Sequence, residues 1–251
     1  MPFETLSVER DKNVGFLTIN RPASMNALCA AFMGEAARAL ADFRDDESIR
    51  VLVIKGLPDC FAAGTDMSDL ASDAKRVEFA QGVKAFDSFP KPIVAAVNGY
   101  AFGGGLELVL KSDVVIAADD ARFGFPEITL GVLPQMGGAA ALARRIGRAK
   151  AADLLLTARQ MSAEEALACG LVSRIVDSDS VAETAAETAA RIAQLPVAGT
   201  ALVRQILEKA EENDTATALS VARLSLFSDD AKEGLTALRE NRAPIFSQKA
   251  V

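Results

Sequence analysis

The sequence PIVAAVNGYAFGGGLELVLKSDVVIAA, residues 92–118, joins two apolar runs through a glycine turn and a short apolar helix. The runs at 92–98 and 113–118 lack the polar alternation of a half-exposed strand, which is typical of strands buried on both faces of a sheet. Two parallel strands need a crossover connection between them, and this is usually a helix. The stretch therefore predicts an α/β fold with mostly parallel strands.

The same kind of pattern continues on both sides of this stretch. Before it, apolar spacing predicts strands at 14–20 and 50–55 and helices at 25–43 and 73–88. From about residue 136 the pattern is mainly helical, with one short strand predicted at 171–176, and prolines bound the last helices. The helices predicted in this second part cover 137–147, 149–158, 162–170, 179–194, 197–211, 215–226 and 230–241, with the breaks at Pro196 and Pro244.

The composition excludes several kinds of chemistry. The chain of 251 residues contains no histidine, so it has no imidazole general base and no zinc site built on histidine. Its three cysteines, Cys29, Cys60 and Cys169, lie far apart without a C-x-x-C pair, so no metal site is predicted. Acid–base chemistry near pH 7 must then use carboxylates, lysine, cysteine or the single tyrosine, Tyr100.

The charge balance and the termini bear on partners and compartment. The formal net charge is −7, which argues against nucleic acid or an anionic membrane as the main partner. The N-terminus is polar, and no apolar run reaches the roughly 20 residues that a membrane span needs. Few and unpaired cysteines are typical of a reducing compartment, so we expect a cytoplasmic protein without a membrane span.

Three successive glycines, Gly103, Gly104 and Gly105, follow a predicted strand and open a helix. Glycines let the backbone approach a ligand closely, and the first N–H groups of a helix lack partners, so this turn could bind an anion or an oxyanion. The spacing fits neither a dinucleotide fingerprint nor a P-loop. A plain tight turn between strand and helix is the competing interpretation.

Two glutamates lie in apolar surroundings near these glycines. Glu107 is flanked by leucines, and burial of its carboxyl group would raise the pKa, as suits a general acid or base. Its alternatives are a salt bridge to Lys111 or a favourable place in the first turn of the helix. Glu127 lies in FGFPEITL, and its alternative is a surface carboxylate at a turn. Two such carboxylates in a chain without histidine are more informative as a pair.

A second glycine turn, FAAGTDM at 61–67, follows the buried strand at 50–55. The backbone N–H of Thr65 could face that of Gly104 and complete an oxyanion hole for a carbonyl group. The competing interpretation is a simple connection in which Asp66 caps a helix.

At this point several ordered motifs coincide, and the sequence resembles the enoyl-CoA hydratase/isomerase, or crotonase, superfamily. The resemblance covers nearly the whole chain, and it implies a spiral of ββα units followed by helices that build homotrimers, often paired into hexamers. We expect the spiral core at residues 1–190 and the C-terminal helical trimerisation region at 191–251. The motifs are NRPASMNAL (20–28), CFAAGTDMSDL (60–70), 91–117, ARFGFPEITLGVLPQMGG (121–138), SAEEALACGLVSRIV (162–176) and KEGLTALRENRAPIF (232–246).

The resemblance implies roles for four residues. In the family, two backbone N–H groups hold the thioester oxygen of an acyl-CoA, and they match Thr65 and Gly104. The hydratases add two glutamates, which match Glu107 and Glu127. The joint presence of both favours an enoyl-CoA hydratase, which adds water across a trans-2-enoyl-CoA to give a 3-hydroxyacyl-CoA. Glu107 is expected to hold and deprotonate the water, and Glu127 to position it and handle the proton at C2.

The resemblance also implies where the CoA moiety lies, mainly along backbone. No cofactor is expected beyond the coenzyme A of the substrate itself. Arg242 and Phe246 match positions that can touch CoA from a neighbouring subunit, although a surface arginine and a helix-anchoring phenylalanine are equally good interpretations. The residues matched to CoA binding in the same subunit are Asn26, Ala27, Leu28, Phe61, Ala62, Ala63, Gly64, Asp66 and Gly103.

Three departures from the hydratase pattern bear on the substrate. Gln135 stands where hydratases often carry glycine, AAALARR (139–145) lacks a common polar continuation, and Phe125 occupies a position where glutamine is frequent. The alternatives are a Δ3-Δ2-enoyl-CoA isomerase, which could use one glutamate as a proton shuttle, and a non-catalytic acyl-CoA-binding protein on the same fold. The acidic balance and the lack of a basic stripe argue against RNA binding.

Overall fold

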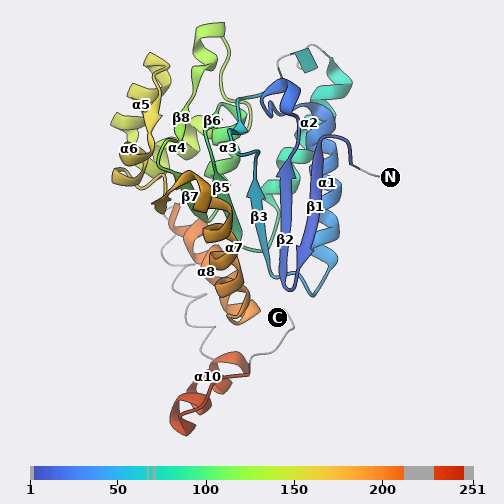
Figure 1. The fold of residues 1–251 in the computed structure, drawn as a ribbon, viewed down its shortest axis with the longest axis vertical. Coiled ribbons are helices and arrows are strands. Elements are labelled where there is room, and N and C mark those ends of the chain that lie inside the picture. Colours follow the sequence, from blue (N-terminus) through green and yellow to red (C-terminus); the bar gives the residue numbers. More distant parts are fainter. Residues whose placement is uncertain (1–2, 67, 70–71, 212–228, 246–251) are drawn as a thin grey trace.

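The computed structural model describes residues 3–66, 68–69, 72–211 and 229–245 (Figure 1). Within these residues two sheets form, a six-stranded sheet in the order β1-β2-β3-β5-β7-β10 and a four-stranded sheet in the order β4-β6-β8-β9. The strands are β1 Leu6–Asp11, β2 Val14–Ile19, β3 Val51–Lys55, β4 Cys60–Ala62, β5 Ile93–Val97, β6 Tyr100–Phe102, β7 Val114–Ala118, β8 Arg122–Gly124, β9 Met161–Ser162 and β10 Arg174–Val176.

The two sheets are built by a repeated ββα turn of the chain. Each repeat places its first strand in the six-stranded sheet and its second strand in the four-stranded sheet before a helix follows. The repeats are β3-β4-α2, β5-β6-α3 and β7-β8-α4, and the strands that follow one another within each sheet are parallel. The predicted α/β spiral of ββα units is therefore confirmed.

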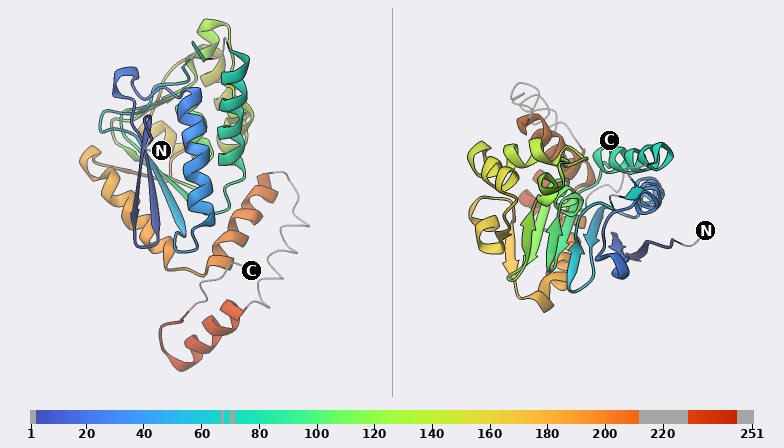
Figure 2. Two further views of the ribbon diagram at one scale, coloured as in Figure 1. Left: turned by 90° about the vertical axis from the view of Figure 1, so that its right-hand side faces the viewer. Right: turned by 90° about the horizontal axis from the view of Figure 1, so that it is seen from above.

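Helices enclose these sheets and continue beyond them. Figure 2 shows the six-stranded sheet between α7 on one side and the neighbouring helices α1 and α2 on the other. The α-helices are α1 Ala30–Asp45, α2 Asp73–Asp87, α3 Gly104–Leu110, α4 Gly138–Ile146, α5 Arg148–Thr157, α6 Ala163–Ala168, α7 Val181–Ala193, α8 Val197–Glu211 and α10 Asp229–Glu240, and short 3-10 helices occur at Pro22–Ser24, Pro126–Leu130 and Ser178–Ser180.

The core follows from the apolar runs of the sequence. All five residues of β5 are buried, and four of the five residues of β3 and of β7 are buried as well. A strand in this central position contacts side chains on both faces, which is why these runs show no polar alternation. The strands predicted at 50–55, 92–98 and 113–118 are thus confirmed.

The helix predicted at 25–43 begins five residues later than the sequence suggested. Met25 and Asn26 have φ of 48° and 58°, in the left-handed region that interrupts a helix. The helix starts after Cys29, whose Sγ accepts a hydrogen bond from the Phe32 N–H at 3.3 Å. Residues 25–29 form a turn in which Leu28 and Cys29 are buried against the core. Their apolar spacing therefore resembles that of a helix although no helix forms there.

Short strands escaped the sequence prediction. The four-stranded sheet consists of two- and three-residue strands, which are too short to show a period. The predicted strand at 171–176 is also shorter than expected, because only Arg174–Val176 pairs with β7. The first strand, β1, is mostly polar and pairs at the edge of the large sheet, where one side of a strand meets solvent.

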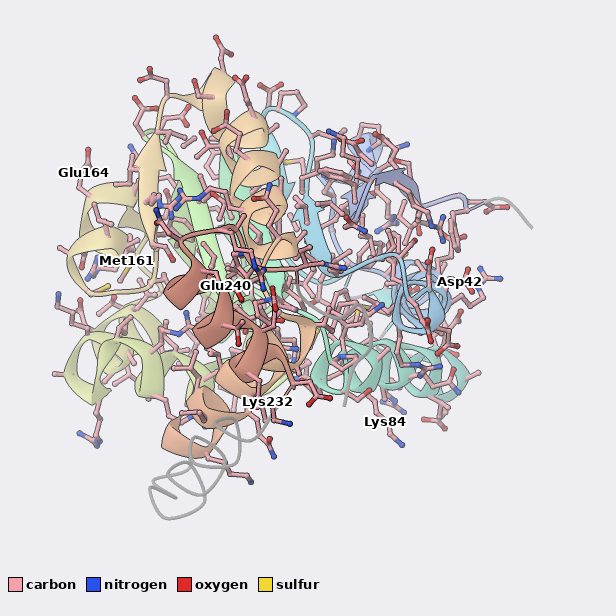
Figure 3. All side chains as sticks on the ribbon, turned by 90° about the horizontal axis from the view of Figure 1, so that it is seen from below. Asp42, Lys84, Met161, Glu164, Lys232 and Glu240 are labelled. Atoms are coloured by element: carbon pink, nitrogen blue, oxygen red, sulfur yellow. The ribbon has the colours of Figure 1, made fainter. Side chains whose placement is uncertain are left out.

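The C-terminal helices leave the α/β body. Figure 1 shows α8 descending from the body and α10 lying below it, and Figure 3 shows Lys232 and Glu240 along α10. The helix predicted at 215–226 lies outside the described residues, so it remains a prediction, as does the domain division at 190/191. Among the helices described, none is both long and apolar enough to span a membrane.

Two helical glycines provide a matched test of packing. A Cβ at Gly105 on α3 would collide with the Ala62 carbonyl oxygen and lie 2.8 Å from the Ala62 Cβ, whereas a Cβ at Gly199 on α8 would meet nothing closer than 3.5 Å. We expect Gly105→Ala to lower the free energy of unfolding by about 1–3 kcal/mol. Gly199→Ala should leave it unchanged or raise it by up to about 1 kcal/mol. Urea denaturation of both variants tests the difference, and equal effects would contradict the packing argument.

Candidate active site

Three neighbouring parallel strands end at one edge of the four-stranded sheet. Their order is β4-β6-β8, and Thr65, the glycine triplet and Glu127 follow β4, β6 and β8 respectively. Because the carboxyl ends of parallel strands lie at the same edge, segments that are far apart in sequence meet there. The upper part of Figure 1 shows this edge, with α3 starting directly after β6.

The glycine triplet lets the turns after these strands touch. A Cβ at Gly104 would lie 2.5 Å from Thr65 Oγ1 and 3.4 Å from the Gly64 carbonyl oxygen. A Cβ at Gly103 would lie 2.5 Å from Glu127 Oε1, and Gly103 has φ of 48°, which favours glycine. A side chain at either position would displace the side chain of Glu127 or Thr65 from its place.

Two backbone N–H groups are left to face a ligand. Leu28 donates to the Gly64 carbonyl at 2.8 Å and accepts from the Asp66 N–H at 2.7 Å, so the N–H of Thr65 points away from Leu28. Gly104 is the first residue of α3, where an N–H has no carbonyl one turn earlier. Among the backbone hydrogen bonds of the described residues, none outside the regular elements is donated by the N–H of Thr65 or Gly104.

The side chain of Asn26 fixes β4, the strand that leads into the Thr65 loop. This side chain is completely buried, with Nδ2 donating to the Cys60 carbonyl at 3.0 Å and the Phe61 carbonyl at 3.2 Å. Its Oδ1 accepts from the Arg21 N–H at 2.8 Å. The amide therefore joins the 21–28 turn to β4, and only the backbone of Asn26 remains for a ligand.

An arginine joins the same two segments at the surface. Arg21 donates to the Ala27 carbonyl and forms a 3.2 Å ion pair with Asp66 Oδ2. Hydrogen bonds from Ser68, together with Arg21, hold the pKa of Asp66 below its usual value. Asp66 thus makes the turn with Ser68 that its capping interpretation suggested, and it also anchors the loop that carries Thr65.

Glu107 is a buried carboxylate that accepts hydrogen bonds from three backbone N–H groups. It is only 1% exposed. Oε1 accepts from Met136 and Gly138, both at 2.7 Å, and Oε2 accepts from Gln135 at 3.1 Å. Burial raises the pKa of Glu107, and the three donors oppose part of that rise because they favour the charged form.

The salt bridge considered for Glu107 is not present. Lys111 pairs with Asp87 of α2 instead. The donors are Gly138, the first residue of α4, and Met136 and Gln135 in the turn before it. The sequence indicated this turn only through the pair Gly137–Gly138 at the start of a predicted helix. Their role toward Glu107 escaped sequence reasoning because it depends on how α3 and α4 pack.

Glu127 has a contrasting environment. It lies in the 3-10 helix after β8, and its Oε2 is buried without a hydrogen-bond partner among the described residues. Burial, with a smaller contribution from the nearby charge of Glu107, raises its pKa to about 7. The alternative of a surface carboxylate is therefore excluded for Glu127.

The remaining residues matched to CoA binding divide by position. Phe61 and Ala62 are completely buried, so they offer backbone rather than side chains, and Ala63 and Gly64 lie half-buried in the turn before Thr65. Arg242 lies beyond α10, far from the glycine turn, and pairs with Glu233 and Glu240. Phe246 lies outside the described residues.

The site combines two N–H groups with two carboxyl groups in different environments. Paired N–H groups stabilise negative charge that develops on a carbonyl oxygen. Of the carboxyl groups, Glu107 has three donors that favour its charged form, while Glu127 Oε2 has no partner among the described residues and the pKa of Glu127 is about 7. Such a pair can supply one base and one acid, so the arrangement suits proton transfer next to a carbonyl group.

Comparison with known proteins points in the same direction. The chain matches the family model described as "Enoyl-CoA hydratase/isomerase" over residues 9–249. It is 42% identical to a probable enoyl-CoA hydratase, echA8, of Mycobacterium bovis over 99% of this chain and 100% of that protein. It is 36% identical to the 2,3-dehydroadipyl-CoA hydratase of Escherichia coli, covering 96% of this chain and 98% of that protein. A crystal structure of an enoyl-CoA hydratase subunit from Geobacillus kaustophilus shares 34% identity with a TM-score of 0.91, covering 98% and 99% of the two chains.

The environment of Glu127 predicts a pH-dependent stability. Because its pKa is raised to about 7, its contribution to stability is complete below the ordinary carboxyl pKa and is lost as pH rises through about 7. Glu127→Gln removes the buried charge, so we expect its melting temperature to exceed wild type by about 2–6 °C at alkaline pH, with the difference shrinking toward pH 5. Thermal unfolding across pH measures this. Glu187→Gln at an exposed position on α7 is the control, and a pH-independent difference for Glu127→Gln would contradict the assignment.

Proposed function

The chain belongs to the enoyl-CoA hydratase/isomerase family, and from this premise we propose that it is an enoyl-CoA hydratase. It adds water across the double bond of a trans-2-enoyl-CoA to give a 3-hydroxyacyl-CoA. The observation that carries the proposal is the pair of glutamates, the buried Glu107 and the half-buried Glu127 with its buried Oε2, at the edge where two backbone N–H groups are available.

The N–H groups of Thr65 and Gly104 bind the thioester oxygen of the substrate. Negative charge moves onto this oxygen as water attacks C3, and fixed N–H dipoles stabilise that charge more than the ground-state carbonyl. One such donor typically contributes about 3 kcal/mol to the barrier. The CoA moiety lies along the backbone of Asn26, Ala27 and Leu28 and of the turn from Phe61 to Asp66, which the Asn26 and Arg21 contacts hold together.

The two glutamates divide the proton transfers. Glu107 holds the water and takes its proton as the oxygen bonds to C3. Burial raises the pKa of Glu107, which suits a base, and the three N–H donors stabilise its charged form. Glu127 in its protonated form delivers a proton to C2, which its pKa of about 7 allows at neutral pH. No histidine, metal or further cofactor takes part in this scheme.

The assembly and compartment complete the proposal. We propose a homotrimer or a dimer of trimers in the cytoplasm, in which the C-terminal helical region meets neighbouring subunits. Arg242 and Phe246 would reach a CoA bound by the adjacent subunit. The extension of α8 and α10 away from the body supports this arrangement, because helices with exposed apolar residues such as Val203 and Leu207 need a partner surface.

The isomerase alternative needs only one of the two glutamates of the same site. Moving a double bond between C3 and C2 requires one proton shuttle and no water, so one of the two glutamates would be superfluous. A carboxyl group buried without a partner is costly, which favours a function that needs both. The names of the relatives give different substrates, enoyl-CoA in one and 2,3-dehydroadipyl-CoA in another. They therefore do not define the acyl group of this protein's substrate, which has to be inferred from the structure.

Loss of the enone absorbance of crotonyl-CoA tests the activity directly. We expect wild-type protein to hydrate it and Glu127→Gln to lower kcat by about 10²–10⁴-fold, because general acid catalysis at C2 is removed. Glu187→Gln, at an exposed site on α7, should retain wild-type activity. Conversion of a 3-enoyl-CoA without hydration of any 2-enoyl-CoA would establish the isomerase instead, and CoA-ester binding without turnover would establish a binding protein.

The pH profile tests the assignment of the acid. Hydration requires protonated Glu127, so kcat/KM for hydration should fall as pH rises above about 7. Hydration exchanges no net proton with solvent, so kcat/KM for the reverse reaction, dehydration of a 3-hydroxyacyl-CoA, must follow the same pH profile. Rates of wild type and of Glu127→Gln, measured from pH 5.5 to 9, test whether Glu127 causes the fall above about 7. A fall that persists in the residual activity of Glu127→Gln would assign the titration to another group.

A further inference from the structure

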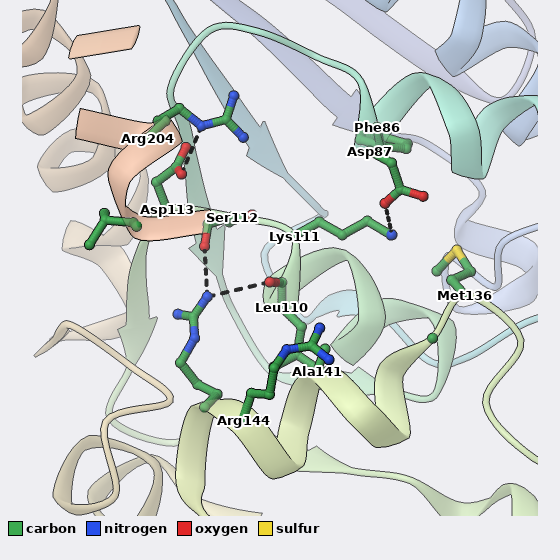
Figure 4. A pocket seen from close by; sticks show the side chains of 13 residues that line it. Phe86, Asp87, Leu110, Lys111, Ser112, Asp113, Met136, Ala141, Arg144 and Arg204 are labelled. Carbon is green, nitrogen blue, oxygen red and sulfur yellow. Dashed lines mark hydrogen bonds and ion pairs between the residues drawn. The ribbon is translucent and has the colours of Figure 1, made fainter. Parts of the chain in front are cut away.

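A second hollow lies at the far end of the helix that carries Glu107. It is a cavity of about 890 Å³ between α2, α4 and α8, with the C-terminal end of α3 in its wall (Figure 4). Its apolar lining comes from Phe86, Leu110, Met136 and Ala141. Four basic residues line the same cavity against two acidic ones, although the protein as a whole carries a net charge of −7.

The cavity adjoins the proposed active site through one loop. The backbone N–H of Met136 donates to Glu107 Oε1, while Met136 and Gly137 themselves line the cavity. The loop therefore has Glu107 on one side and the cavity on the other. A chain that extends from the thioester past Glu107 would meet this loop and then the apolar residues of the cavity.

Both carboxylates of the cavity are already neutralised. Asp87 pairs with Lys111, and Asp113 forms a 2.9 Å ion pair with Arg204 Nε and accepts from the Ile93 N–H at 2.7 Å. Figure 4 shows both pairs on the cavity wall. Arg145 of α4 lines the same cavity, and its charge is not used by either of these two carboxylates.

Arg145 lies on α4 and lines the cavity. Its Nη2 lies 3.4 Å from the carbonyl oxygens of Leu110 and Ser112, which fixes the guanidinium at the end of α3. Among the described residues no carboxylate pairs with Arg145, and its Nε and Nη1 make no hydrogen bond. A half-buried guanidinium with unused donors favours an anionic ligand, since a carboxylate can accept two of its N–H groups at once.

The distance from the oxyanion-binding N–H to this guanidinium defines the ligand length. Gly104 and Leu110 are the first and last residues of α3, so a helical rise of about 1.5 Å per residue separates them by roughly 9 Å. An extended acyl chain with roughly seven carbon–carbon bonds covers that length. A carboxylate at its far end would then lie beside Arg145.

We propose that the substrate class is an enoyl-CoA whose acyl chain ends in a second carboxylate, and that Arg145 binds this terminal carboxylate. This inference rests on the proposed function, because it assumes that the thioester oxygen lies at Thr65 and Gly104. The apolar residues of the cavity accept the methylene groups, and the guanidinium replaces the water that a terminal carboxylate loses on entry. An unsubstituted chain gains nothing from Arg145 and leaves its unused donors without a partner.

The test compares two substrates of equal length, trans-2-octenedioyl-CoA and trans-2-octenoyl-CoA. We expect wild-type kcat/KM to favour the dicarboxylic ester by about 10–100-fold, as a charge-assisted hydrogen-bonded pair would give. Arg145→Gln should reduce this ratio to near one, and Arg145→Lys should restore part of it because the charge is kept. Arg148→Gln removes an exposed arginine at the start of α5, outside the cavity, and should keep the wild-type ratio.

Other results of this comparison would overturn either the role of Arg145 or the proposed hydratase function. Hydration of both esters with equal efficiency, or a preference that survives Arg145→Gln, would overturn the inference and leave the hydratase proposal intact. If neither ester is hydrated, the proposed function fails, and calorimetric binding of the saturated suberyl-CoA and octanoyl-CoA still tests the site. Tighter binding of suberyl-CoA that depends on Arg145 would support the inference, and equal binding would overturn it.

Discussion

The close approach of three turns at the end of β4, β6 and β8 is the constraint on which the site depends. It is possible because Gly103 and Gly104 have no side chains, so Glu127 and Thr65 can lie where a Cβ would otherwise collide. The parallel order of the three strands brings the turns to one edge, and the buried amide of Asn26 fixes the first of them. Backbone N–H groups and carboxyl groups thereby lie within reach of one small ligand.

The electrostatics of the site depend on how many hydrogen-bond donors each carboxyl group has. Burial disfavours the charged form of both, but Glu107 has three N–H donors where Glu127 Oε2 has no partner. The difference can separate an acceptor of protons from a donor of protons without any histidine in the chain. The raised pKa of Glu127 costs stability at neutral and alkaline pH, a cost that is common for the kind of group that the proposed function requires.

The sequence allowed the fold class and the centre of the site to be predicted, because both leave local signals. Unbroken apolar runs mark the central strands, a glycine triplet marks the turn, and glutamates between apolar residues mark Glu107 and Glu127. The start of α1 and the short strands were missed since left-handed residues and three-residue strands have no period. The donors to Glu107 could not be predicted because they lie in the turn before α4 and at its first residue, which only packing brings near Glu107.

The loop of residues 135–138 contacts both Glu107 and the cavity beside α3. Its N–H groups donate to Glu107, and Met136 forms part of the cavity wall along which the proposed acyl chain lies. A loop with both tasks cannot adapt to a new chain without also moving donors that lie 2.7 Å from the carboxylate. Chain selectivity is therefore easier to change at the far end of the cavity, where Arg145 contacts α3 through carbonyl oxygens and touches no group that transfers a proton. In this proposal Glu107, within α3, serves proton transfer, and Arg145, beside the C-terminal end of α3, serves recognition of the acyl chain. Because the two functions lie at different points along α3, the reaction would stay the same while the preferred acyl group changes.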